Sequence, residues 1–108
     1  MDEAKVYEAY HELPNGFEVQ VMVLQDYPGG RPRRGLAPSI YRSRVWIGTA
    51  EEPDPLLHRS QEHPALQAAI DACYTMLLNS ARQVISSPEA LAALEGHIER
   101  YFQGAATH

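Results

Sequence analysis

The side chains that could do chemistry in this chain of 108 residues follow no recognisable catalytic pattern. The histidines are His11, His58, His63, His97 and His108. No two of them have the His-x-x-x-His spacing of metal ligands on a helix. Cys73 lies within an apolar helical stripe, which indicates a small core residue rather than a nucleophile. We therefore predict no catalytic residue, no cofactor and no metal site.

Two of the histidines lie on apolar faces of predicted elements. His11 falls on the apolar side of an alternating segment, and His97 borders an apolar helical stripe. Both positions favour a histidine at the edge of the core over a general acid or base. A lesser alternative for the whole chain is a small-molecule binder or enzyme, with a pocket between the predicted sheet and its loops.

Basic charge is concentrated in one part of an otherwise acidic chain. The formal net charge is −5, yet residues 31–49 contain five arginines and no acidic residue. These predicted anion-binding residues are Arg31, Arg33, Arg34, Arg42 and Arg44. Arginine can hold a phosphate through two hydrogen bonds, and the nearby Tyr27 and Tyr41 could stack on bases. Because the rest of the chain is acidic, nucleic acid or another anionic ligand is the alternative partner and not the favoured one.

The only tryptophan, Trp46, lies in the alternating segment 40–49, which predicts a strand. One of its faces, which we expect to pack on the core, carries Tyr41, Ser43, Val45 and Ile47. Its other face carries Ile40, Arg42, Arg44 and Trp46. This second face combines basic and aromatic side chains, so it is the part of the strand that could contact a partner.

Two further strands are predicted at residues 5–13 and 17–25, joined by Leu-Pro-Asn-Gly. A two-residue turn at Asn15 and Gly16 would bury carboxylates on the core face. A three-residue loop, with a type I turn at Pro14 and Asn15 and a left-handed Gly16, pairs Leu13 with Phe17 instead. That register gives one apolar face, so we predict the three-residue loop.

Helices are predicted at residues 64–85 and 88–103, after irregular loops at 27–39 and 50–62. Pro64 suits a first helical turn with Ser60 or His63 as its cap. Ser87, Pro88 and Glu89 form a second start signal, and Gly104 is the expected end. The second helix could pack beside the first or reach a partner chain.

These elements predict an α+β fold of one domain, residues 1–108, with a three-stranded antiparallel sheet followed by two helices on one face. The order of the strands in the sheet stays open. The chain has no apolar run of membrane-spanning length and no signal-peptide pattern, so we expect it in the cytoplasm. Its single cysteine fits a reducing compartment.

The outer face of the predicted sheet is more apolar than a solvated face requires. The predicted interface residues on it are Tyr10, Met22, Leu24, Ile40 and Trp46. Glu8, Glu12 and Glu18 fall on the same face, where we expect them to pair across strands with Arg42 and Arg44. With its arginines neutralised, the face suits a protein better than a phosphate. We predict a non-catalytic protein that acts by association with another protein or with itself, most simply as a dimer.

Overall fold

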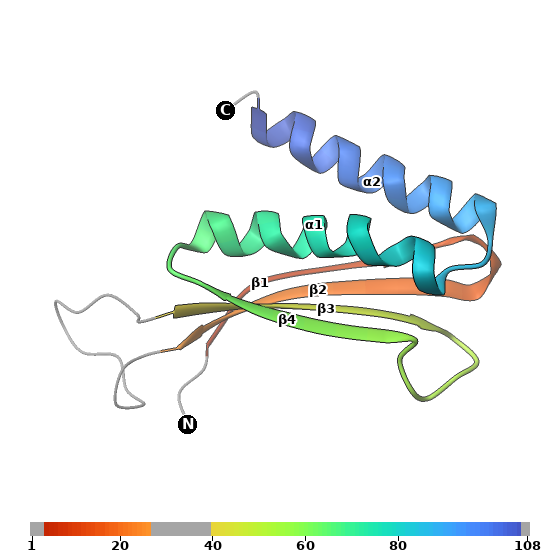
Figure 1. Cartoon of the computed structure of the whole chain (residues 1–108), viewed down its shortest axis with the longest axis horizontal. Helices are drawn as coiled ribbons and strands as arrows, with labels where there is room; N and C mark the ends of the chain where they lie inside the picture. Colours follow the sequence, from red (N-terminus) through yellow and green to blue (C-terminus); the bar gives the residue numbers. More distant parts are fainter. Residues whose placement is uncertain (1–3, 27–39, 107–108) are drawn as a thin grey trace, which may run out of the picture.

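The computed structural model describes residues 4–26 and 40–106, which form a four-stranded antiparallel sheet with two helices on one side (Figure 1). The elements in chain order are β1 (Ala4–Glu12), a single 3-10 turn η1 (Pro14–Gly16), β2 (Phe17–Asp26), β3 (Ile40–Thr49), β4 (Leu57–His63), α1 (Leu66–Val84) and α2 (Pro88–Ala106). Each strand pairs with the next one in sequence, in the order β1-β2-β3-β4. The predicted α+β class with an antiparallel sheet and two helices is confirmed.

The predicted number of strands was wrong, because β4 occupies part of the segment 50–62 that was expected to be irregular. This strand lies at the edge of the sheet and pairs only with β3. Leu57 is its only buried residue, since most of its side chains face solvent. The predicted loop at residues 27–39, with Arg31, Arg33 and Arg34, lies outside the described residues.

The predicted register of the first hairpin is confirmed, with His11 opposite Val19 and the Leu13 amide donating to the Phe17 carbonyl at 2.7 Å. The turn itself differs from the predicted type I geometry. Asn15 and Gly16 both have left-handed backbones, with φ of 64° and 82°. Asparagine tolerates this region better than most residues.

The core lies between the sheet and α1, which packs on β2, β3 and β4. The Ser43 hydroxyl, fully buried in this layer, donates a 2.6 Å hydrogen bond to the Ala69 carbonyl of α1. Cys73 is also fully buried, and this burial raises the pKa of its thiol. The thiol therefore stays protonated, which supports the predicted core role of Cys73.

The first helix begins later than predicted. Ala65 is its N-cap residue, and no side chain caps it. Ser60 and His63, the predicted caps, belong to β4 instead. Pro64 therefore precedes the helix and lies in the turn between strand and helix.

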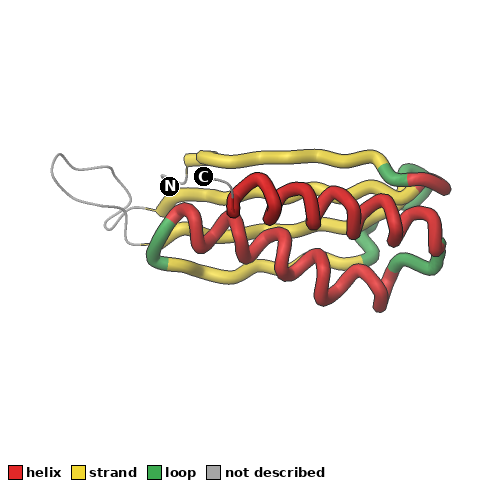
Figure 2. The backbone as a smooth tube through the Cα atoms, turned by 90° about the horizontal axis from the view of Figure 1, so that it is seen from above, coloured by secondary structure: helices red, strands yellow, loops and turns green. Residues whose placement is uncertain are grey.

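The second helix packs beside α1 on the same side of the sheet (Figure 2), which settles the question that the sequence left open. The Ser87 hydroxyl accepts a hydrogen bond from the Ala90 amide at 3.2 Å, so the predicted cap is confirmed. Ala90, Leu94 and Ile98 form its buried stripe. The helix continues past Gly104, the predicted end, to Ala106. In the described part of the chain, neither helix is long and apolar enough to cross a membrane.

A candidate interface on the open face of the sheet

Both helices lie on one side of the sheet, and no described helix or strand covers the other side (Figure 1). We call this second side the open face. The four strands pair antiparallel, with one register shift between Lys5 and Tyr7 of β1, and from Tyr7 onward the side chains of this face form rows across the strands. The central row consists of Tyr10, Gln20, Trp46 and His58, and the next row consists of Glu8, Met22, Arg44 and Ser60.

The structure places all five predicted interface residues on the open face. Tyr10, Met22 and Trp46 lie in the two adjacent rows at its middle. Tyr10 is 50% exposed, while Met22 and Trp46 are half-buried. Leu24 and Ile40 lie towards the far end of the sheet, where Leu24 is buried and Ile40 is opposite Asp26. The apolar group therefore has a compact centre around Trp46 and a more distant part around Leu24.

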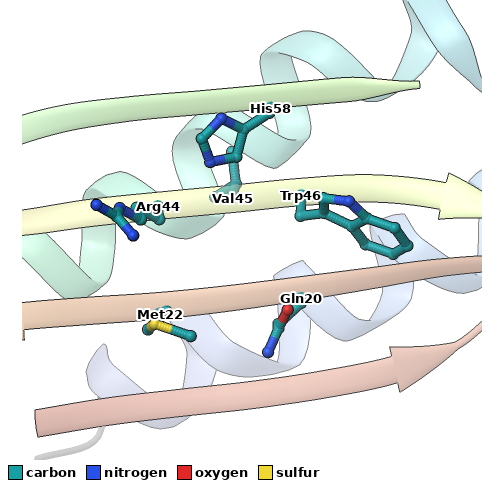
Figure 3. Close-up of a pocket in the computed structure, with 6 residues that line it drawn as sticks. All are labelled: Gln20, Met22, Arg44, Val45, Trp46 and His58. Carbon is teal, nitrogen blue, oxygen red and sulfur yellow. The ribbon is translucent and has the colours of Figure 1, made fainter. Parts of the chain in front are cut away.

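The Trp46 indole lies over Gly48, the next residue on the same face of β3. A β-carbon placed on Gly48 would overlap the six-membered ring of the indole. The glycine thus leaves room for the ring to lie along the strand, pointing away from Arg44 (Figure 3). This pairing of an aromatic side chain with a neighbouring glycine is a known device in β-sheets. No pattern in the sequence indicated it.

The orientation of Trp46 leaves a shallow hollow between its side chain and Arg44. The hollow has a volume of about 170 Å³. It is lined by Gln20, Met22, Arg44, Val45, Trp46 and His58 (Figure 3). It therefore joins members of the predicted interface to one of the predicted anion-binding residues. His58 is a lining residue that sequence reasoning missed, because β4 was not predicted.

Two acidic side chains of the open face, Glu8 and Glu18, are bound by neighbours on β1 and β2. Glu8 accepts hydrogen bonds from Lys5 at 3.1 Å and from Gln20 at 2.9 Å. Glu18 accepts a 2.5 Å hydrogen bond from the Tyr10 hydroxyl. This bond is the main reason why the pKa of Tyr10 is raised to about 12. These contacts stay on one half of the sheet, away from β3.

The predicted ion pairs of Glu8, Glu12 and Glu18 with Arg42 and Arg44 are wrong. The strand order puts β2 between β1 and β3, so Arg44 has Met22 and Ser60 as its cross-strand neighbours. Arg42 lies opposite Leu24 and Glu62. Within the described residues, neither the Arg44 guanidinium nor the Glu12 carboxylate has a hydrogen bond or an ion pair. Glu62 of β4, opposite Arg42 on the same face, also has no such partner, so among the described residues the open face presents one unpaired base, Arg44, and two unpaired acids, Glu12 and Glu62.

The side of the sheet covered by the helices contains the residues that most suggest acid–base chemistry, a pair of stacked histidines. The rings of His11 and His97 lie 4.4 Å apart between their centroids, and Arg100 contacts His97 Nδ1 at 2.9 Å. Burial, with the positive charges of His97 and Arg100, lowers the pKa of His11. Neither ring bonds to a carboxylate among the described residues. This arrangement fits a packing contact between β1 and α2 better than acid–base chemistry.

The lowered pKa of His11 makes stability depend on pH. In the unfolded chain His11 binds a proton near its ordinary pKa of 6.5, before the folded chain does. Stability is therefore greatest above pH 6.5 and falls as the pH drops from there towards the folded pKa. We expect urea unfolding of the native chain to show a larger loss of stability between pH 7.5 and 5.5 than a His11→Phe variant, in which the ring stack remains. An equal loss in both chains would contradict this assignment.

A network of tyrosines joins β1, α1 and α2. The hydroxyls of Tyr7 and Tyr74 lie 2.7 Å apart, and the rings of Tyr74 and Tyr101 stack at 4.0 Å. The Tyr101 hydroxyl donates to Asp71 at 2.9 Å and accepts from Gln67 at 3.0 Å. Burial raises the pKa of both Tyr74 and Tyr101, so the hydroxyls stay protonated. The tyrosines were predicted as packing residues, and the network adds hydrogen bonds that hold α2 in place.

Over residues 4–26 and 40–106, no three histidine, cysteine, aspartate or glutamate side chains lie close enough together to hold a metal ion. The chain matches no protein-family model, no curated protein and no solved structure. The predicted pocket between the sheet and its loops stays a prediction, and one of those loops, residues 27–39, lies outside the described part. The open face is thus the surface on which a functional proposal can rest.

Proposed function

We propose that this protein acts by association, and that its partner is a second copy of the same chain bound through the open face. The observation that carries the proposal is the position of Trp46, Met22 and Tyr10 at the middle of a sheet face that no described element covers. Tryptophan, tyrosine and methionine are enriched at protein interfaces, and exposed apolar groups on small domains commonly mark contacts.

The distribution of charge supports a second copy as the partner. The β1 side of the open face carries Glu8 and Glu12 with one base, Lys5, while the β3–β4 side carries Arg42 and Arg44 with one acid, Glu62. A surface with an excess of acid on one half and an excess of base on the other is complementary to itself when a second copy is turned by a twofold axis. Because the chain carries a net charge of −5, two copies repel each other overall, and local pairing of this kind must offset that repulsion.

The size of the face sets the expected strength of the dimer. Four strands at about 4.8 Å spacing give a sheet roughly 19 Å wide. Two such faces in contact bury less than the roughly 800 Å² per partner of a standard interface. We therefore expect a dissociation constant in the micromolar range, so that dilution separates the copies.

Trp46 is the only tryptophan, so its fluorescence reports on the open face alone. We expect acrylamide quenching of this fluorescence to weaken at least twofold as the chain concentration rises from about 1 to about 500 µM, because association covers the indole. Free tryptophan amide in matched samples controls for absorption by the protein. Quenching that stays constant over this range would contradict the proposal.

A second candidate function is the binding of an anionic ligand or nucleic acid, and the unpaired Arg44 favours it. Arg42 lies two residues away on the same face, while Arg31, Arg33 and Arg34 lie outside the described residues. Such binding would weaken steeply with salt. A rise in the fluorescence anisotropy of labelled RNA or DNA at low salt, lost in an Arg44→Gln variant, would favour this candidate over self-association.

A further inference from the structure

We propose that Glu12 of one copy binds in the hollow beside Arg44 of the second copy, and that the reciprocal contact forms at the same time. This inference rests on the proposed self-association and names the contact that orients it. It draws on the unpaired Glu12 and Arg44 of the open face, on the hollow next to Arg44, and on the symmetry of a two-copy contact.

Among the described residues, Glu12, Glu62 and Arg44 are the charges of the open face without a hydrogen bond or ion pair. Glu62 lies opposite Arg42 on the same half of the sheet as Arg44, so Glu12 is the acid that can reach Arg44 only from a second copy. The other acids of β1 and β2 near the centre of this face are already bound, Glu8 by Lys5 and Gln20, and Glu18 by Tyr10. Glu12 is exposed and Arg44 is half-buried beside the hollow. A guanidinium in such a position binds a carboxylate more strongly than a freely solvated one does, because less water competes for it.

The two residues cannot meet within one chain. The register places Glu12 opposite Glu18 and Gly48, four residues along β3 from Arg44 and two strands away. At about 3.4 Å per residue and about 4.8 Å per strand, the two positions are roughly 17 Å apart in the plane of the sheet. An ion pair between them therefore requires a second molecule.

A twofold axis between two facing sheets exchanges the two positions, so both contacts form together. The point midway between Glu12 and Arg44 lies at Gln20, in the central row, and the axis passes over it. The strands of the two sheets then cross at roughly 70°, close to the orthogonal class of sheet packing. The same operation brings Tyr10 of one copy over the region of Met22 of the other. It also leaves both copies of Trp46 beside the axis.

The hollow has the chemistry to accept a carboxylate. Arg44 offers a charged donor and His58, on the neighbouring β4, offers a ring nitrogen on the other side (Figure 3). Because the Trp46 indole lies over Gly48, it does not fill the space next to Arg44. A glutamate side chain entering the hollow would therefore meet Arg44, with the half-buried Met22 beside it on β2.

Charge reversal and charge exchange test this contact by sedimentation. We expect Arg44→Glu and Glu12→Arg each to raise the dissociation constant of the dimer at least 30-fold, since close charge pairs at interfaces show effects of this size or larger. An equal mixture of the two variants should form a heterodimer close to native affinity, because each contact then joins a glutamate to an arginine. Arg59→Glu, on the helix-facing side of β4, is the matched control and should leave association unchanged.

The outcomes separate this contact from self-association as such. Recovery in the mixture supports the pairing of Glu12 with Arg44. Loss of the dimer in both variants without recovery in the mixture overturns the pairing, and so does a native-like dimer in either variant. If a charge variant forms a native-like dimer, and that dimer dissociates when Trp46 is also replaced, the open face is still the interface and the proposed function stands. A native chain that is monomeric throughout would instead remove the proposed function itself.

Discussion

A Trp46→Glu chain is expected to fold like the native chain and to remain monomeric at concentrations where the native chain is dimeric. Trp46 lies in the central row of the open face, half-buried by its own strand and close to the proposed axis. Aromatic residues at the centre of an interface typically contribute about 2 to 4 kcal/mol, and a carboxylate there loses its water without gaining a partner. We therefore expect the dissociation constant to rise at least about 100-fold.

The matched control is the same substitution at an exposed apolar residue on the other side of the molecule. Leu78 of α1 is 42% exposed and lies on the helical side, away from the open face. A Leu78→Glu chain should keep the native dissociation constant, as measured by sedimentation velocity. If Leu78→Glu weakened the dimer as much as Trp46→Glu, the helical side and not the open face would be the interface.

Replacing Leu94 with alanine is expected to lower the free energy of unfolding by about 3 kcal/mol, the usual cost of removing a fully buried leucine side chain. Leu94 is 1% exposed and lies between Ala90 and Ile98 in the stripe that holds α2 in place. The network around Tyr101 supports the same helix nearer its C-terminal end. Urea unfolding followed by far-ultraviolet circular dichroism measures the change.

Leu78→Ala provides the comparison, because the same atoms are removed from a side chain that is 42% exposed. We expect it to cost less than about 1 kcal/mol. Equal effects at the two positions would mean that α2 is not packed on the core as the structure has it. Neither substitution touches the open face, so the dissociation constant should respond to neither while both chains are folded.

Much of the fold could be predicted from the sequence, because the elements that bury one face show clear hydrophobic periodicity and begin or end at residues typical of caps and turns. Val19, Val21 and Val23 alternate on β2, and this pattern fixed both the register and the core face. The start of α2 was equally clear, since Ser87 precedes a proline and an acid and does cap the helix. Local patterns succeeded here because each residue's preference agreed with its place in the fold.

The fourth strand could not be predicted, because β4 does not bury the alternating set of side chains that period-two patterns detect. Only Leu57 among its seven residues is buried, and the strand is held mainly by its backbone ladder with β3. Such pairing depends on a partner strand and leaves little trace in side-chain type. The missed strand also shifted the expected start of the following helix.

The site was predicted in part. Alternation alone put Met22, Arg44 and Trp46 on one face, as the structure does. The pairing of acids with Arg44 failed because β2 separates Glu8 and Glu12 from β3, and because the register places Glu18 opposite Gly48. The place of the indole over Gly48 depends on side-chain orientation, which periodicity does not specify. The unpaired Arg44 and Glu12, on which the interface contact rests, became visible only with the strand order in hand.

The most direct test of the proposed self-association is the molar mass of the native chain in solution, measured by sedimentation equilibrium from about 1 to about 500 µM, a range that spans a micromolar dissociation constant. We expect the mass to rise with concentration from the 12.1 kDa of one chain towards twice that value. The rise should be absent in the Trp46→Glu chain. A native chain that stays at 12.1 kDa at the highest concentration would contradict the proposal that the open face binds a second copy.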